Sequence, residues 1–141
     1  MENDSLDIIF KKQCELQKQY GFDFGELISS HGQNSSIIGT MLVDNIDCIH
    51  NELEELRNCI FWKHWCDEAK EGRKNEVRDV QNARVEVIDI LHFFVNICVL
   101  LGLDSEDVLR LYLQKNKVNF ARQELGYPME GKTEEDNKEI K

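Results

Sequence analysis

Two pairs of carboxylates have the residue types and the spacing of a metal site. Glu52 and Glu55 form one pair and Glu86 and Asp89 the other, and in each pair the partners are three positions apart. On a helix, residues three apart project from the same face. If two such pairs faced each other, four negative charges would meet and cations would be needed to offset their repulsion. Oxygen-only ligands favour hard ions, Mg²⁺ first, and Mg²⁺ in turn favours phosphate substrates.

The second pair lies in an apolar setting. The run from Val85 to Leu103 is apolar on nearly every side, which is typical of a helix in the middle of a bundle. Burying Glu86 and Asp89 there without partners would be too costly. A metal ion, a lysine or arginine, or both should therefore lie opposite them. Taken alone, Glu52 and Glu55 are more typical of a solvated helix face, and it is the second pair that favours a functional role for them.

A third group of side chains supplies positive charge and amides. Six residues share one face at three- and four-residue spacing: Tyr112, Lys115, Asn116, Asn119, Arg122 and Gln123. Lysine meets phosphate as a point charge and arginine as a planar fork. Asparagine can donate to phosphate or sugar oxygens, or accept from a base. The alternative is a solvated helix face, but this face continues from Val108 and so begins as core.

Aromatic and histidine side chains complete the set of candidates. Trp62 and Trp65 could plug a core, or could stack on a nucleobase with Lys63 beside a phosphate. His92 follows Asp89 by three residues. It could support the metal ligands, contact a sugar, or be a hydrogen-bonded core residue.

Helices are the elements that must position these residues. Apolar periodicity predicts four of them, at about residues 5–20, 36–62, 80–101 and 105–125. We expect a loop at 22–36 with at most a turn of helix at 24–28, and a mobile connection at 63–79. The fold class is therefore all-α with a four-helix-bundle core. Residues 1–127 form a single helical catalytic domain, and residues 128–141 form a polar, disordered tail.

Composition and net charge restrict the classes of partner that the protein is expected to bind. The chain has 141 residues and a formal net charge of −10, which argues against nucleic acid or an acidic membrane surface as a partner. A small anion is still allowed, because divalent metals bridge carboxylates to phosphates. Five cysteines, an odd number without C-x-x-C spacing, favour free thiols. No signal peptide or membrane-spanning run is evident, so we expect a cytoplasmic protein.

These motifs together resemble the dimeric, all-α dUTPases, which belong with the MazG-like NTP pyrophosphatases. The resemblance covers about residues 6–127. It rests on Glu52-x-x-Glu55, Trp62-Lys-His-Trp65, the block from Asn82 through Glu86-Val-Ile-Asp89 to Phe93, and the block from Lys115 to Tyr127. The paired carboxylates mark only the superfamily. The last two blocks are more specific and favour the dUTPase branch.

The resemblance implies roles for individual residues. It assigns Mg²⁺, with Mn²⁺ as a substitute, to Glu52, Glu55, Glu86 and Asp89, with Glu52 as the catalytic base. It assigns phosphate and nucleoside contacts to Lys115, Asn119 and Arg122, and recognition of the base to a glutamine, Gln17 or Gln13. The residue types themselves, apart from the resemblance, suggest a phosphate contact for Lys63 and nucleoside contacts for Trp62, Trp65 and His92. Among the glutamines, Gln17 is the better match to the family's uracil-reading residue and Gln13 the reserve. Gly21 and His64 depart from the family pattern near the base.

The implied function is hydrolysis of dUTP, and of dUDP, to dUMP by a homodimer, with release of pyrophosphate or phosphate. A related pyrophosphatase acting on another nucleotide, such as dCTP, is the closest alternative. A di-metal carboxylate protein of the ferritin-like kind is a second, although the chain lacks the Glu-x-x-His pair such proteins use. A non-enzymatic helical interaction module is a third.

Overall fold

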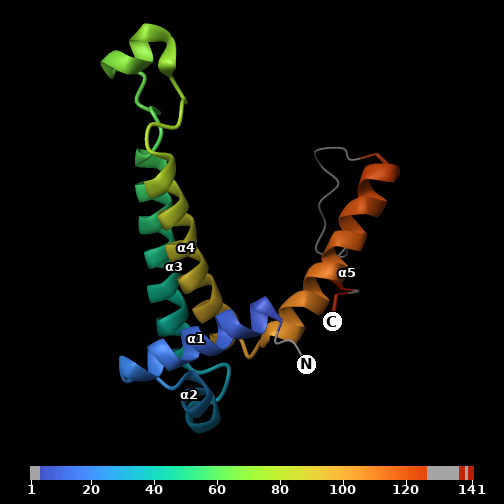
Figure 1. Ribbon diagram of the computed structural model, residues 1–141. Helices are drawn as coiled ribbons and strands as arrows, with labels where there is room; N and C mark the ends of the chain where they lie inside the picture. Colours follow the sequence, from blue (N-terminus) through green and yellow to red (C-terminus); the bar gives the residue numbers. More distant parts are fainter. Residues whose placement is uncertain (1–3, 127–136, 139) are drawn as a thin grey trace.

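The computed structural model describes residues 4–126, 137, 138, 140 and 141. Helices dominate this part of the chain and no β-strand occurs in it, so the predicted all-α class is confirmed. The elements are α1 (Ser5–Gln19), α2 (Phe24–His31), α3 (Ser36–Asn58), a single π-helical turn η1 (Ala69–Arg73), α4 (Val80–Leu100) and α5 (Ser105–Glu124) (Figure 1).

Helix α2 replaces most of the loop predicted at residues 22–36. Its signals are local and clear. The Asp23 side chain accepts a hydrogen bond from the backbone N–H of Glu26, and Phe24 is buried. Gly32, with φ of 83°, ends the helix. The expectation of a single turn was wrong because eight residues are too few to show a convincing apolar period.

Helices α3 and α4 form a long antiparallel hairpin (Figure 1). Helix α3 stops at Asn58, four residues before the predicted end at Trp62. The chain then turns into an isolated antiparallel bridge between Ile60 and Val77. The connection at 63–79 is therefore partly structured, with η1 at its tip.

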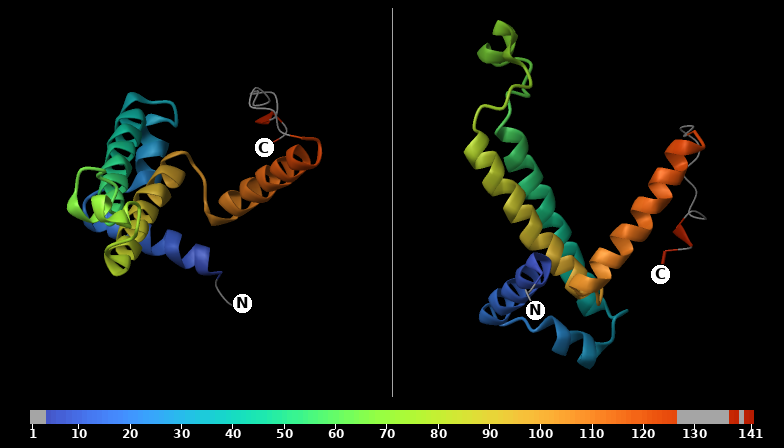
Figure 2. Two further views of the ribbon diagram at one scale, coloured as in Figure 1. Left: turned by 90° about the horizontal axis from the view of Figure 1, so that it is seen from above. Right: turned by 45° about the vertical axis from the view of Figure 1, so that its right-hand side comes forward.

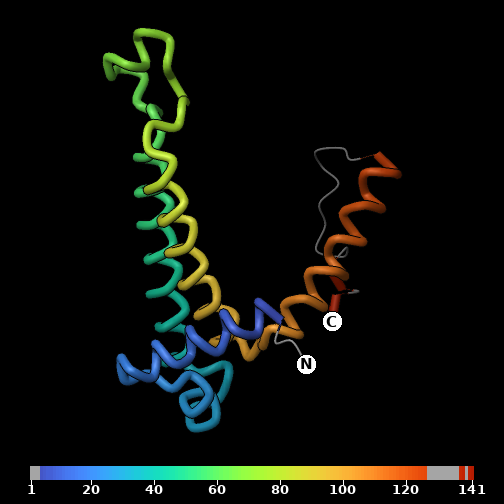
Figure 3. The backbone as a smooth tube through the Cα atoms, viewed as in Figure 1, coloured from blue at the N-terminus to red at the C-terminus, as the bar shows by residue number. Residues whose placement is uncertain are grey.

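The short helices α1 and α2 cover the end of the hairpin that is remote from this connection (Figure 3). Two clusters hold them there. Phe10 of α1 packs with Val95 and Cys98 of α4. Phe24 of α2 packs with Ile38 and Leu100, and both of those side chains are fully buried. The core therefore lies where α1, α2, α3 and α4 meet.

Helix α5 points away from the hairpin (Figures 1 and 2). Its direction is turned by 98° from that of α4. The four long helices of the predicted bundle are present, but α5 does not close the bundle within one chain. Helix α4 is also less buried than its composition predicts, since Val87, Ile88 and Phe94 are each about half exposed.

None of the described helices alone is long and apolar enough to cross a membrane, and only the bent pair α4 and α5, taken together, meets that criterion of length and composition.

Candidate active site

Three of the four predicted metal ligands lie together between α3 and α4. Ligand oxygens of Glu52, Glu86 and Asp89 all lie within 4.8 Å of one another. Helix α3 contributes the first and α4 the other two. Glu55 is exposed and is not part of this group, although its charge still acts on Glu52. The structure thus brings Glu52 of the first predicted pair to both members of the second.

Glu86 is the most deeply buried of the carboxylates, with 6% of its surface exposed. Asn82, one turn earlier on α4, donates to Glu86 Oε1 at 2.9 Å. The same amide contacts Cys59 Sγ at 3.3 Å. Asn82 thereby fixes one oxygen of Glu86 and leaves the other carboxylate positions to a cation.

The electrostatics of this cluster favour a bound cation. Burial raises the pKa of Glu52, and the charges of Glu55 and Asp89 raise it further. Within the described ranges, no lysine or arginine forms an ion pair with any of the four carboxylates. Three carboxylates at close range, with oxygen as the only ligand atom, suit a hard divalent ion such as Mg²⁺.

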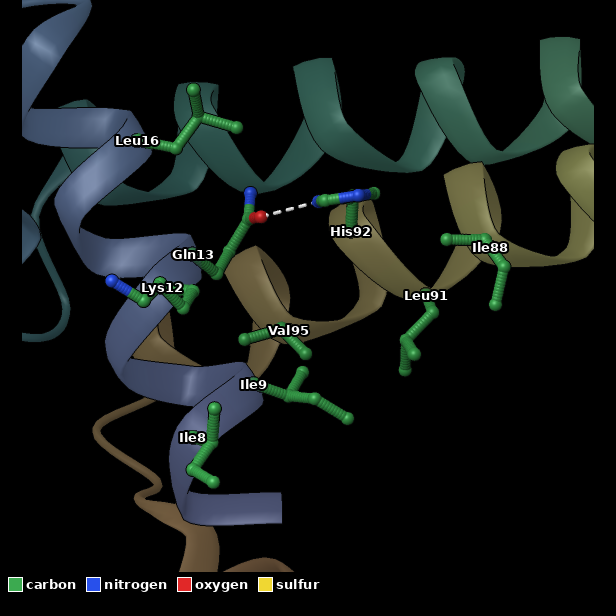
Figure 4. A pocket seen from close by; sticks show the side chains of 9 residues that line it. All are labelled: Ile8, Ile9, Lys12, Gln13, Leu16, Ile88, Leu91, His92 and Val95. Carbon is green, nitrogen blue, oxygen red and sulfur yellow. Dashed lines mark hydrogen bonds between the residues drawn. The ribbon is translucent and has the colours of Figure 1, made fainter. Parts of the chain in front are cut away.

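A chain of side-chain amides connects the hairpin to α1. Asn45 donates to the Met41 carbonyl at 2.8 Å, and Asn96 donates to Asn45 at 2.9 Å. Gln13 then donates to Asn96 at 2.7 Å, and its oxygen lies 2.5 Å from Nδ1 of His92 (Figure 4). Gln13 and Asn96 are both buried.

The donor and acceptor roles along this series of side chains follow from its first member, Asn45. A backbone carbonyl can only accept, so Asn45 must donate its nitrogen and turn its oxygen to Asn96. The same reasoning passes through Asn96 to Gln13, whose oxygen faces His92. Nδ1 of His92 is therefore the donor, which leaves Nε2 of the neutral ring as an acceptor.

Gln13 and His92 also line a pocket between α1 and α4 with a volume of about 450 Å³ (Figure 4). The rest of its lining is mostly apolar: Ile8, Ile9, Lys12, Leu16, Ile88, Leu91 and Val95. Gln17 does not line it. Gln13, the reserve candidate, therefore lines the pocket and bonds to both Asn96 and His92. Gln17, the preferred candidate, does neither.

The tryptophans and Lys63 lie in the connection beyond the end of α3. Trp62 donates to Asn58 Oδ1 at 3.2 Å and is covered by the Arg57 guanidinium, 3.6 Å from the ring centroid. Trp65 packs edge-on against Trp62 and is 55% exposed. Trp62 and Lys63 help line a second pocket of about 310 Å³, which also includes Arg78.

Lys115, Asn119 and Arg122 are three predicted site residues that lie away from the carboxylates in the single chain. All three are on α5, which diverges from the hairpin. The sequence places Lys115 and Arg122 opposite the acidic pairs, and this stays a prediction, because α5 of a single chain points away from the hairpin that carries those pairs (Figure 1). The reason is the sharp bend between α4 and α5, which periodicity does not predict.

Asn96 and Asn45 are site residues that the sequence interpretation missed as a pair. Asn96 lies four residues after His92 within the apolar run, and Asn45 lies on the same polar strip of α3 as Glu52. That spacing was the available signal. It does not reveal that one amide bonds to the other.

The chain was also compared with known proteins. The family model described as dUTPase matches residues 5–99 and 94–127. The chain belongs to this all-α dUTPase family. The predicted resemblance is thereby confirmed.

Individual relatives point to the same chemistry. A dCTP pyrophosphatase of Enterobacteria phage T4 is 37% identical over 149 residues, covering 89% of this chain and 84% of the relative. A dCTP pyrophosphatase of Enterobacteria phage LZ5 is 28% identical, covering 88% and 83%. A DNA replication protein of phage T4 is 34% identical, covering 82% of this chain but 34% of that protein. No solved structure matches the chain significantly. Family and relatives together support a nucleotide pyrophosphatase activity.

Proposed function

We propose that this dUTPase-family protein hydrolyses a pyrimidine deoxynucleoside triphosphate, dCTP or dUTP, to its monophosphate and pyrophosphate, with Mg²⁺ as cofactor. The observation that carries the proposal is the cluster of Glu52, Glu86 and Asp89, three carboxylates that form no ion pair with a lysine or arginine in the described part of the chain. The family model favours dUTP as substrate, while the two similar pyrophosphatases are named for dCTP.

Each carboxylate has a distinct part in this proposal. Glu86 and Asp89 would hold Mg²⁺ together with Glu52, with Glu55 as a further ligand at the exposed edge. Mg²⁺, when bound, offsets the charge of the phosphate chain and supports attack by water. Mn²⁺ would be a substitute.

Glu52 is suited to take the proton from the attacking water. Its raised pKa makes it a stronger base than an ordinary carboxylate. Glu86 is less suited, because one of its oxygens already accepts a hydrogen bond from Asn82. Lys115 and Arg122 would stabilise charge on the phosphate oxygens.

The amide chain from Met41 to His92 bears on nucleoside recognition. Nε2 of His92 is an acceptor, so it suits a donor on the substrate. The sugar 3′-hydroxyl is a donor in both nucleotides, whereas the 4-amino group is a donor in cytosine alone. His92→Ala therefore separates these roles. An equal rise in KM for dCTP and dUTP indicates the sugar. A rise for only one of them indicates the base, through the cytosine 4-amino group for dCTP or the uracil N3–H for dUTP.

A nucleotide panel tests the proposal directly. Purified protein with Mg²⁺ is supplied with each of the four common deoxynucleoside triphosphates and with dUTP and dUDP, and pyrophosphate or phosphate release is measured. We expect turnover to be at least tenfold higher with dCTP or dUTP than with purine nucleotides, and to be lost when EDTA replaces Mg²⁺. Equal turnover of purines would overturn the pyrimidine assignment. Absence of turnover with every nucleotide would overturn the activity itself.

A further inference from the structure

We infer that Asn45 is a positioning residue for the nucleotide, although it lies three hydrogen bonds away from His92. Through the amide chain, Asn45 decides which ring nitrogen of His92 carries the proton, and it thereby keeps Nε2 as an acceptor for the substrate. The inference rests on the proposed function, because it assumes that His92 contacts the nucleoside. It deepens that function by naming the residue that sets which kind of substrate group His92 can bind.

The amide chain has a fixed starting point in the backbone of α3. Asn45 donates to the Met41 carbonyl at 2.8 Å, one helical turn earlier. A backbone carbonyl has no proton to give, and its position is set by the helix itself. If the Asn45 amide turned over, its oxygen would face the carbonyl oxygen of Met41. The orientation of Asn45 is therefore fixed by a group that cannot adapt.

Each following amide takes its orientation from the one before it. Asn96 donates to Asn45 Oδ1 at 2.9 Å, and Gln13 donates to Asn96 Oδ1 at 2.7 Å. The Gln13 oxygen is then left to face Nδ1 of His92 (Figure 4). Turning over any one amide would set two donors or two acceptors against each other. Asn96 and Gln13 are only 2% and 4% exposed, so water cannot relieve such a mismatch.

The cost of a mismatch determines how strongly the histidine is held. Leaving one buried polar group unpaired shifts an equilibrium between two states by about 5- to 150-fold. We therefore expect the Nδ1–H form of His92 to exceed the Nε2–H form by a factor in that range. The hydrogen bond at one ring nitrogen sets the role of the other, so Nε2 is the acceptor. His92 is exposed, and Nε2 has no hydrogen-bond partner among the residues that the structure describes.

His92 lies where a nucleoside would follow a phosphate chain held at the carboxylates. It comes three residues after Asp89, so the two side chains project to the same side of α4, about 5 Å apart along its axis. Asn45 lies about 10 Å before Glu52 on α3, and its amide is already bonded to Met41 and Asn96. Asn45 therefore acts through His92 rather than by touching the nucleotide.

A purely structural part for the amide chain makes a different prediction. If the chain only ties α1 to the hairpin, any substitution of Asn45 that removes a hydrogen bond should have the same effect. Asn45→Leu and Asn45→Asp separate the two cases. Aspartate has lost the bond to Met41 but still accepts from Asn96, so the donor and acceptor roles along the chain are kept. Leucine keeps neither bond.

Nitrogen NMR on protein with ¹⁵N-labelled histidine reads the proton position without any need for turnover. At about pH 8.5, where the neutral ring is the common form, the two nitrogens give distinct shifts according to which one is protonated. His92→Gln assigns the signal. We expect the Nδ1–H form in wild type and in Asn45→Asp, and a change of about fivefold or more toward Nε2–H in Asn45→Leu. Asp44→Leu, at the neighbouring exposed position of α3, is the matched control and should leave the wild-type signal unchanged.

Kinetics then connect the proton position to the substrate. Asn45→Leu should raise KM about fivefold or more for the same nucleotide that His92→Ala affects, and it should change kcat by less than about twofold. In the His92→Ala background, Asn45→Leu should raise KM by less than about twofold, because both substitutions remove one interaction. Asn45→Asp and Asp44→Leu should keep KM near the wild-type value.

Several results would overturn this part for Asn45. They are an Nε2–H form of His92 in the wild type, an unchanged signal in Asn45→Leu, or KM effects that multiply in the double variant. Equal losses in Asn45→Asp and Asn45→Leu would also overturn it, in favour of a structural tie. Wild-type protein that turns over no nucleotide would instead overturn the proposed function, and the NMR signals would still show whether Asn45 sets the proton position.

Discussion

In the metal-free protein, burial and the neighbouring carboxylates disfavour the charged form of Glu52. Its raised pKa means that the folded chain holds a proton more tightly than the unfolded chain does. The resulting stability is fully present below the ordinary carboxyl pKa of about 4.5, and it is lost as pH rises through the raised value. In EDTA, the melting temperature should therefore fall across that interval.

Glu52→Gln should remove this pH dependence and raise the metal-free melting temperature at neutral pH. It should also weaken Mg²⁺ binding and lower kcat by about 10²-fold or more, the usual contribution of a general base. Thermal melts in EDTA at several pH values, calorimetric Mg²⁺ titration and pyrophosphate release give the three readouts. Near-normal kcat would remove Glu52 from the mechanism.

Gln13 and Gln17 offer a matched pair on α1. Gln13→Ala breaks the amide chain and leaves the buried Asn96 amide and Nδ1 of the exposed His92 without their partner. We expect a loss of about 1–3 kcal/mol of unfolding free energy and a higher KM for the nucleotide. Gln17→Ala should change stability by less than about 0.5 kcal/mol, as is usual for a position outside such a network. Denaturant melts and KM values on both variants decide between them. A larger effect at Gln17 would restore the family-based preference for it.

At the scale of elements, the junction between α4 and α5 is the feature with the largest consequence. Gly102→Ala places a side chain at φ of 76°, with its Cβ 3.0 Å from the Gln33 side-chain oxygen. The left-handed backbone alone should cost about 1–2 kcal/mol. Activity should fall further than stability, because the direction of α5 sets where Lys115 and Arg122 lie.

Gly39→Ala is the control for that change. Gly39 lies within α3, and nothing is within 4 Å of an added Cβ. Alanine should stabilise the helix there by about 0.5–1 kcal/mol. Comparing chemical denaturation and turnover for the two variants isolates the junction. Equal behaviour of the two would show that the bend has no special role.

The open shape of the single chain is the main feature at the scale of the whole molecule. Phe94 is 46% exposed and continues a line of half-exposed apolar side chains along α4, seven residues apart, that includes Val80 and Val87. Phe94→Glu would place a charge in the expected dimer contact, so we expect a monomer at micromolar concentration and at least a tenfold loss of turnover. Sedimentation equilibrium and pyrophosphate release measure the two effects.

Phe22→Glu is the matched control, because Phe22 is also 46% exposed but lies between α1 and α2. It should leave association and turnover unchanged. A Phe94→Glu protein that stays dimeric and active would place the dimer contact elsewhere, or remove the need for one.

The sequence by itself determined the helices and the acidic pairs. The long apolar periods of α3 and α4 persist over several turns, so local pattern was enough to locate them, and three-residue spacing put each carboxylate pair on one face. It also carried the family resemblance, since motif residues are fixed in type and order. The short α2 was not predicted at its full length, because its sequence signals are an N-cap and a terminating glycine rather than an apolar periodicity.

Only the tertiary structure decided which of these faces meet. The approach of Glu52 to Glu86 and Asp89 depends on the register of α3 against α4, and the link from Gln13 to Asn96 joins residues far apart in the chain. The bend at Gly102 separates Lys115 from the carboxylates that it was expected to face. Such contacts arise from packing between elements, and a one-dimensional pattern specifies the face of a helix without specifying its neighbour.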